Sequence, residues 1–332
     1  MPAPSQALSG FRPDLGSMFQ FDMEMNRNGF IANRVAPVVD VADQSGTVGL
    51  VTLKQFLKEP ETGRDSRGNY NRTNYDFEDF TYETEENGIE LPIDRRRAKI
   101  YREWFDFEVM STRVAYDVVL RAYEYRVANL LYNATTFASS TAAITHEWND
   151  WTNAVPLTDV IKGKQSIWEN TGLYPNALVI NRRQFLNLRM NAQVIDKLES
   201  GGAGESVKPG AVTRQMLADC FDLDEIIVAD SARDSANEGQ SVDIAPMWSD
   251  EYAMLARVAR TSNPEEPALC RTIHWSEDGS QIGGTLETYY DDASRGDIVR
   301  VRHETQEKVF YTSLGYLFSN VIDASGGDDV PA

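Results

Sequence analysis

Histidine and cysteine form no recognisable catalytic or metal-binding pattern in this chain. The three histidines, His146, His274 and His303, make no H-E-x-x-H or H-x-x-x-H pair, and no C-x-x-C motif occurs. His146, Glu147 and Asp150 could in principle ligate a metal ion, but neighbouring residues on a polar loop are far more often exposed to solvent. The spacing of these residues therefore predicts no metal site.

Glycine-containing motifs of enzymes are also incomplete. Gly163-Lys164 could end a phosphate-binding loop, but Thr158 stands where a glycine is required, and Gln165 stands where Ser or Thr would contact magnesium. Residues 279–283 place their serine wrongly for a nucleophile elbow. A glycosidase-like pair is not excluded among the 51 Asp and Glu residues, yet no pair is marked out. We therefore predict that the chain is not an enzyme and binds no cofactor.

Composition limits the class of protein. At 332 residues the chain is longer than one hydrophobic core usually serves, so at least two lobes are expected. Its net charge of -19 argues against DNA binding through clustered Lys and Arg. No apolar run approaches the roughly 18–20 residues that span a bilayer, so no membrane partner is expected. Two cysteines, Cys220 and Cys270, make no disulfide framework, which fits a reducing cytoplasm.

Residues 1–48 are predicted to form an extended arm. Pro, Gly, Ser and Asn are scattered among short apolar pieces, and the apolar residues from Ile31 to Val41 follow no sustained helical or strand period. One short helix at most is expected here. Such an arm cannot bury its own apolar groups, so we expect a neighbour to cover them.

A long β-hairpin is predicted next. Residues 48–57 favour a strand, 59–72 form a tip rich in Gly, Asn and Pro, and 75–84 return as a second strand. The hairpin has few large apolar residues and should be marginal in isolation. Its tip carries three arginines, Arg64, Arg67 and Arg72, while the returning strand and the turn after it are acidic. This complementarity suits an arm that lies across an identical neighbour, although a solvated hairpin of mixed charge explains it equally well.

Residues 107–133 carry the strongest helical pattern. Large apolar residues recur at helical spacing on one face: Tyr116, Val119, Leu120, Tyr123, Val127, Leu130 and Leu131. A second edge alternates in charge, which predicts modest support from ion pairs: Arg113, Asp117, Arg121 and Glu124. We expect this long helix to be the backbone against which other elements pack.

Helical and strand patterns alternate after a Ser/Thr/Ala/Asn-rich connection at 134–155. The predicted helices are 159–170, 182–198 and 213–221, and the predicted strands are 177–180 and 225–228. Alternation of this kind indicates a mixed α/β lobe. The last stretch, 284–322, is rich in strand-forming residues.

Several segments occur in a specific order along the chain. They are 82–94 before the long helix, 172–180 with its buried strand, 185–196, 216–229, 247–255 and the terminal strand 316–322. Each is weakly specific, but their number and order resemble the tailed-bacteriophage major capsid proteins of the Hong Kong 97-like fold, over approximately residues 20–322. In this resemblance 82–94 is similar to that family's passage from E-loop to spine helix, and 316–322 suits its peripheral domain.

The resemblance implies an α+β fold divided as in that family. The expected parts are an N-terminal arm (1–48), an E-loop β-hairpin (49–94), a peripheral (P) domain with the spine helix (95–150), an axial (A) domain (151–283), and P-domain strands with a C-terminal tail (284–332). It also implies a major capsid protein that self-assembles into hexamers and pentamers of an icosahedral head enclosing double-stranded DNA.

Copies of the chain itself are the first partners that the resemblance implies. The resemblance also implies that the subunits assemble around a scaffold in the bacterial host cytoplasm and then reside in the virion capsid. The arm starts almost at once, so a separate scaffolding protein is expected, together with a portal; a decoration protein is left open. Packaged double-stranded DNA would be held without sequence-specific binding.

The expected contacts between subunits lie on the hairpin and just before the long helix. They are Arg64, Arg67, Arg72, Phe77, Glu78, Asp79, Arg95, Arg96 and Arg97. Other classes remain open: an encapsulin-type nanocompartment shell, a gene-transfer-agent shell, and an acidic α/β hydrolase with an unrecognised site. The arm and the hairpin, which have too little core of their own, favour either kind of shell over the hydrolase.

Overall fold

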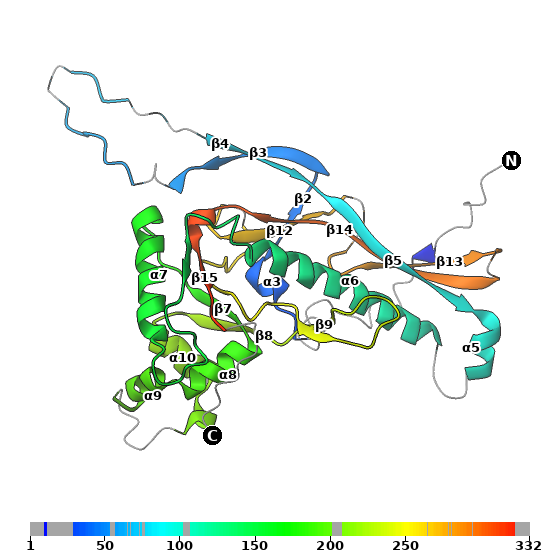
Figure 1. Cartoon of the computed structure of the whole chain (residues 1–332). Helices are drawn as coiled ribbons and strands as arrows, with labels where there is room; N and C mark the ends of the chain where they lie inside the picture. Colours follow the sequence, from blue (N-terminus) through cyan, green and yellow to red (C-terminus); the bar gives the residue numbers. More distant parts are fainter. Residues whose placement is uncertain are drawn as a thin grey trace.

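The computed structural model of the chain combines two packed sheets, a long central helix and a projecting hairpin (Figure 1). It describes residues 10–11, 29–53, 57–64, 66, 68–72, 74, 77–101, 107–200, 208–263, 265–277, 279, 281–293 and 295–322. Within these ranges the strands form a six-stranded sheet, a five-stranded sheet and two two-stranded ribbons. None of the helices in these ranges is long and apolar enough to cross a membrane.

The six-stranded sheet is organised around its longest strand, β14 (Gly296–Val309). β5 (Glu85–Asp94) pairs antiparallel with β14 along ten positions. β13 (Thr285–Asp291) pairs with the first half of β14, and β12 (Cys270–Trp275) pairs with the second half. β14 is therefore shared by three strands that come from distant parts of the chain.

Two strands from the N-terminal region complete this sheet. β1 (Gly10–Phe11) pairs antiparallel with β13, and β2 (Val38–Val41) runs parallel to β12. The short helix α3 (Ala32–Val35) precedes β2. At the other end of β5 lies α5 (Arg95–Tyr101), which leads toward the long helix.

The long helix α6 (Phe107–Leu131) packs against β14 and β5 through the predicted apolar face. Its 25 residues make a rod of roughly 38 Å. The buried members of the predicted stripe are Tyr116, Val119, Leu120, Tyr123, Val127 and Leu131, and Leu130 is partly buried. The predicted helix and its core-facing stripe are therefore confirmed.

The five-stranded sheet has the order β6–β15–β11–β7–β8. Its strands are β6 (Thr141–Ala143), β15 (Gly315–Ser319), β11 (Ala253–Ala256), β7 (Ala177–Asn181) and β8 (Glu225–Ala229). The predicted strands at 177–180 and 225–228 are confirmed as the parallel pair β7 and β8. The C-terminal strand β15 pairs with β11 and β6 and not with β13 or β14.

Helices cover one face of this second sheet. They are α7 (Pro156–Thr171), α8 (Arg182–Met190), α9 (Ala192–Leu198) and α10 (Arg214–Phe221). The single helix predicted at 182–198 is divided at Asn191, whose side chain accepts a hydrogen bond from Val194 N and so caps α9. The other face of the sheet packs on the α6 core.

Alternate residues of β7 pack into two different hydrophobic cores, one on each face of the five-stranded sheet. Leu178 and Ile180 lie in the cluster under α7–α10, whereas Ala177 and Val179 lie in the cluster around α6. Side chains of a strand alternate between faces, so a strand buried on both faces joins the two clusters. The expected pair of lobes is thus held together by a common sheet.

The N-terminal arm differs from the prediction where it is described. Phe30, Ile31, Ala32, Val35 and Ala36 are all buried in the α6 core of the same chain. Tertiary packing supplies the cover that the local sequence lacks, because α3 lies between α6 and β12. The expectation that a neighbour must cover these residues is therefore wrong for the apolar residues of 30–36; most of residues 1–28 lie outside the described ranges.

Short elements complete the described chain. They are the 3-10 turns η2 (Pro209–Ala211) and η3 (Thr312–Leu314), and the ribbon of β9 (Ala232–Asp234) with β10 (Ile244–Pro246). In Figure 1 the β9 ribbon lies over α6. Arg121 on α6 donates a hydrogen bond to Ala232 O at 2.9 Å, which fixes the ribbon there.

Candidate functional site

The projecting hairpin is built from β3 (Ser45–Val51) and β4 (Phe77–Glu83). The strands pair antiparallel, with Ser45 opposite Glu83 and Val51 opposite Phe77, and the segment between them extends away from the body (Figure 1). The predicted hairpin is confirmed, although its first strand begins three residues earlier than expected and ends at Val51, short of the predicted residue 57. The acidic turn expected after it is instead the strand β5, because residues 85–94 pair with β14.

The tip of the hairpin holds itself together without a core. Arg64 donates from Nε to Gly68 O at 2.8 Å, and its guanidinium lies 4.7 Å from the centre of the Tyr70 ring. Asn71 Nδ2 donates to Glu61 O at 2.7 Å across the tip. Tyr70 is 71% exposed. The tip therefore presents a stacked arginine and tyrosine to the outside, and these residue types are common anchors of protein interfaces.

The root of the hairpin is fixed to β14. Thr84 Oγ1 and Gln44 Nε2 both donate to Glu304 Oε1, at 3.0 and 2.9 Å. Gln306 Oε1 accepts from the backbone N–H of Glu83 at 3.0 Å. These contacts join both sides of the root to one strand of the main sheet. A rigid root with a projecting tip is the geometry of an arm that reaches a separate molecule.

Apolar packing supports the same junction. The rings of Phe80 on β4 and Phe310, which follows β14, lie 4.4 Å apart. Lys308 lies over the Phe80 ring and donates to Thr81 O. A recess of about 470 Å³ remains between the hairpin and β14, lined mostly by polar residues that include Thr47, Thr81 and Gln306.

The predicted contact residues fall at two separate places. Four have described side chains, and all four are exposed: Arg64, Arg72, Asp79 and Arg96. Phe77 and Glu78 lie on β4 and Arg95 and Arg97 on α5, but their side chains, and Arg67 altogether, lie outside the described residues. The hairpin tip and α5 lie at opposite ends of the molecule (Figure 1), so the structure does not bring these residues into one site.

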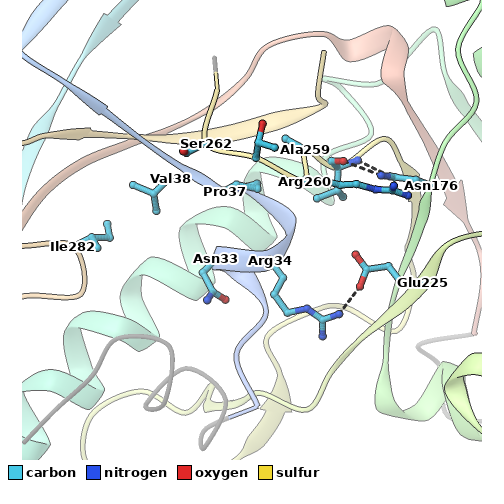
Figure 2. Close-up of a pocket in the computed structure, with 12 residues that line it drawn as sticks. Asn33, Arg34, Pro37, Val38, Asn176, Glu225, Ala259, Arg260, Ser262 and Ile282 are labelled. Atoms are coloured by element: carbon cyan, nitrogen blue, oxygen red, sulfur yellow. Dashed lines mark hydrogen bonds and ion pairs between the residues drawn. The ribbon is translucent and has the colours of Figure 1, made fainter. Parts of the chain in front are cut away.

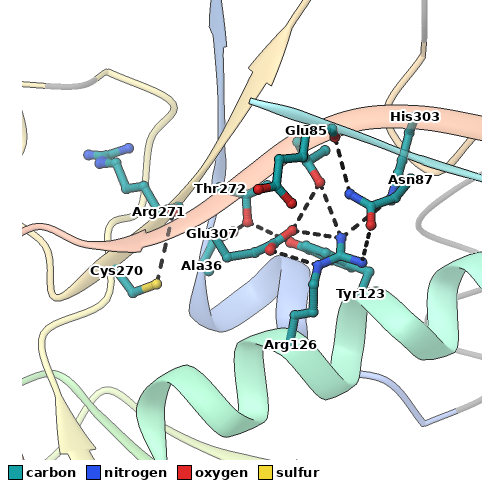
Figure 3. Close-up of polar contacts among 11 residues, drawn as sticks. Ala36, Glu85, Asn87, Tyr123, Arg126, Cys270, Arg271, Thr272, His303 and Glu307 are labelled. Atoms are coloured by element: carbon teal, nitrogen blue, oxygen red, sulfur yellow. Dashed lines mark hydrogen bonds and ion pairs between the residues drawn. The ribbon is translucent and has the colours of Figure 1, made fainter. Parts of the chain in front are cut away.

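A partly buried polar network that the sequence analysis missed ties α6 to the six-stranded sheet (Figure 3). Arg126 donates from Nε and Nη2 to the two carboxylate oxygens of Glu307, both at 2.9 Å, and from Nη1 to Asn87 Oδ1 at 3.3 Å. The hydroxyls of Tyr123 and Thr272 share a hydrogen bond at 2.8 Å. Its signal in the sequence was Arg126 itself, a charge directly beside the apolar stripe.

His303 lies at the edge of this network. Burial, followed by the positive charge of Arg126 and by His274, lowers the pKa of His303 from its ordinary value to about 3. Its Nδ1 is buried with no hydrogen-bond partner among the described residues. His303 is therefore a neutral ring within the core.

Glu124 also differs from its predicted place. Its carboxylate is fully buried and accepts hydrogen bonds from Ala32 N at 2.7 Å, Ile31 N at 3.0 Å and Trp248 Nε1 at 2.6 Å. Burial raises the pKa of Glu124, and these donors offset part of that rise. The predicted ion-pair edge of α6 is therefore wrong at Glu124, which instead holds the arm and Trp248 to the helix.

A groove of about 560 Å³ opens between α3, the start of β8 and the loop after β11 (Figure 2). Arg34 and Glu225 form an ion pair at 2.5 Å beside it. Asn176 exchanges two hydrogen bonds with the backbone of Val258, at 2.8 and 2.7 Å. Its polar groups are thus paired with one another, and its lining residues provide no nucleophile next to a base.

The structure does not complete the metal site or the phosphate-binding loop that the sequence brought into question. No group of three or more His, Cys, Asp or Glu residues that could hold a metal ion occurs within the described ranges. Asp150 accepts hydrogen bonds from the backbone N–H groups of Thr152 and Asn153, and so stabilises the turn that these residues form. Gly163 and Lys164 lie within α7, not in a phosphate-binding loop before a helix.

Two curated proteins are similar to the chain over nearly its whole length. The major capsid protein of Pseudomonas phage JBD67 is 25% identical over 304 residues, covering 90% of this chain and 94% of that protein. The major capsid protein of Burkholderia phage BcepMu is 25% identical over 306 residues, covering 88% and 91%. No protein-family model matches the chain.

Solved structures share the fold at lower sequence identity. A phage-related protein from Bordetella bronchiseptica aligns with a TM-score of 0.69 at 18% identity, over 94% of this chain and 98% of that one. The capsid protein of cyanophage P-SCSP1u aligns with a TM-score of 0.59 at 10% identity, over 96% and 92%. An encapsulin from Synechococcus elongatus gives a TM-score of 0.51 at 11% identity, over 87% and 86%.

The two kinds of comparison agree with the order of elements in the chain. Sequence similarity points to phage major capsid proteins, and structural similarity points to the same mixed helix-and-sheet architecture. The relatives are structural proteins of capsids. The chain is therefore related to the phage major capsid proteins, has their Hong Kong 97-like fold, and is a structural protein, not an enzyme.

Proposed function

We propose that copies of this chain assemble into the hexamers and pentamers of an icosahedral phage head that encloses double-stranded DNA. The observation that carries the proposal is the hairpin β3–β4, whose root is fixed to β14 and whose tip presents Arg64 and Tyr70 to solvent. A hairpin without a core is marginal alone and gains stability when it lies on another molecule. Its similarity to capsid proteins makes a second copy the natural partner.

In the proposed subunit the parts keep the division expected from the sequence. Residues 1–48 act as the N-terminal arm and 49–94 as the E-loop, while 95–150 and 284–332 form the P-domain and 151–283 the A-domain. The pairing of β15 with β11 links the segment 284–332 to the sheet of the proposed A-domain. Arg64, Arg72 and Asp79 would contact a neighbour through the hairpin, and Arg96 would contact a different neighbour at the far end of β5.

Other partners follow from the same function. A separate scaffolding protein would guide assembly in the bacterial host cytoplasm, a portal would occupy one vertex, and a decoration protein could bind the outside of the finished virion capsid. The net charge of -19 favours packaged DNA held by confinement and not by sequence-specific contacts.

Deletion of residues 59–73 tests the hairpin assignment. We expect a folded subunit with an unchanged thermal transition that forms no stable shells in negative-stain microscopy, because the deletion removes the tip and leaves the root contacts intact. Shortening the polar segment 236–241 between β9 and β10 is the matched control and should leave assembly unchanged. Normal particles from the 59–73 deletion would overturn the assignment.

An encapsulin-type shell or a gene-transfer-agent shell is the second candidate, favoured by the structural similarity to an encapsulin. The contents of particles purified from cells that carry the native gene neighbourhood separate these functions. Nuclease-protected double-stranded DNA supports a phage head or a gene transfer agent, and a co-purified cargo protein without nucleic acid supports a nanocompartment. DNA of one phage genome, and not of random host fragments, then separates phage from gene transfer agent.

A further inference from the structure

Helix α7 carries an apolar stripe on its outer face. Ile161 and Trp168 are two turns apart and are 52% and 49% exposed. Tyr174 stacks on Trp168 with ring centres 6.3 Å apart and an angle of 22° between the rings. At the far end of the stripe, Leu57 lies against Gly172, where the helix ends in the left-handed conformation with φ of 70°.

The fold of the chain does not need this stripe. α7 is anchored by its opposite face, where Val160, Gly163 and Ile167 are buried against the second sheet. Gly163 lies so close to Phe318 and Leu255 that a side chain there would be crowded. Large aromatic side chains that cover each other but little else are more typical of an interface than of a solvated helix face.

Charge makes this face a place where identical copies can approach. The whole chain carries a net charge of -19, so copies repel each other over most of their surface. The exposed positions of α7 beside the stripe carry Lys162 and Glu169, and Lys164 is paired with Asp222 at 2.7 Å. The charges named around the stripe cancel, so this face adds no like-charge repulsion between copies.

We propose that the α7 stripe, formed by Ile161, Trp168, Tyr174 and Leu57, docks on a second copy of this chain. The contact is heterologous: the stripe of one copy meets a different surface of the next, as closure of a ring requires. Leu57 opens the tip of the hairpin, so the stripe is continuous with the arm that reaches the same neighbour. This inference rests on the proposed self-assembly and names a second surface for it.

The first test truncates the stacked pair. In the full-length chain, Trp168→Ala with Tyr174→Ala should raise the subunit concentration needed for half-assembly at least tenfold, roughly the effect of losing one interface anchor. Val242→Ala with Ile244→Ala is the matched control, since these residues on and beside β10 are 70% and 75% exposed and lie outside the stripe. Half-assembly of the stripe variant at the wild-type concentration overturns the proposal.

The second test does not depend on the stability of the aromatic variant. Ile161→Cys is introduced with Cys220→Ser; the remaining Cys270 is buried. A maleimide should modify residue 161 at least about tenfold more slowly in particles than in free subunits, since a well-packed interface core excludes solvent. Equal rates overturn the proposal. Protection only in particles that contain a scaffolding protein assigns the stripe to that partner and also overturns it.

Failure of the stripe and failure of the proposed function give different results. If the wild-type chain forms particles, but the alanine substitutions do not change assembly and residue 161 is labelled equally fast in particles and free subunits, the docking role of the stripe is contradicted. The proposed self-assembly is then unaffected. A wild-type chain that forms no particles under any condition, with or without co-expressed scaffold, removes both.

Discussion

At the scale of single residues, Glu124 joins three segments that are distant in the sequence. Its carboxylate lies on α6 and binds the first turn of α3 and the indole of Trp248. A buried carboxylate is costly unless it is satisfied by several donors, as it is here. The arm is consequently held in the core by a polar contact as well as by apolar packing.

Glu124→Leu should lower the free energy of unfolding of the free subunit by about 3–5 kcal/mol, because two backbone N–H groups and an indole N–H lose their buried acceptor. Glu124→Gln keeps one acceptor oxygen and should cost less. Denaturant unfolding followed by tryptophan fluorescence measures both. Arg113→Ala on an exposed position of α6 is the control and should stay within about 0.5 kcal/mol of wild type. Equal stabilities for Glu124→Leu and the control would contradict the role of the carboxylate.

His303 makes a prediction about acid stability. Its pKa is about 3 in the folded chain and near 6.5 when unfolded, so below pH 6.5 the unfolded state binds one more proton. Stability should fall by about 1.4 kcal/mol per pH unit from this residue alone as pH drops from 6.5 toward 3. His303→Gln should remove that slope, and His146→Gln, at an exposed position, should keep it. Unfolding titrations at pH 6, 5 and 4 decide between the two outcomes.

At the scale of elements, the hairpin root fixes the projecting arm to the main sheet. Phe310→Ala removes the ring packed on Phe80 and should speed amide hydrogen exchange in β3 and β4 by about 2–10-fold, because an aromatic pair contributes about 0.5–1.5 kcal/mol. Exchange in β5, which is paired with β14, should not change. Val242→Ala is the control; uniform acceleration throughout the chain would show global destabilisation instead.

Elements with a local pattern were predictable from the sequence. The buried stripe of α6 and the parallel pair β7–β8 appear in the periodicity and in short apolar runs. β2 and β12 were missed because they pair with each other across more than 200 residues of sequence, and because the apolar residues of α3, just before β2, are covered only by tertiary packing. Glu124 and Arg126 were misjudged or missed for the same reason: a charge beside an apolar stripe becomes buried only when another segment supplies its partners.

At the scale of the whole molecule, N-terminal, central and C-terminal segments are interleaved. β15, near the C-terminus, lies between β6 and β11, and α3 from the arm lies inside the α6 core. Among the described residues, the hairpin tip and the α7 stripe stay largely exposed. A subunit of this kind should unfold as one unit, while its assembly depends on a small part of its surface and on its overall charge.

That overall charge predicts how assembly responds to salt. Copies with a net charge of -19 repel each other, and raising salt from 0.1 M to 1 M shortens the screening length from about 10 Å to about 3 Å. The subunit concentration for half-assembly, measured by light scattering, should therefore fall severalfold over this range. Arg64→Glu at the hairpin tip should raise it most at low salt, and Arg64→Gln should raise it less, because reversal adds repulsion where neutralisation only removes attraction. A half-assembly concentration that rises with salt would mean that attraction between charged surfaces outweighs the net repulsion, contrary to this prediction.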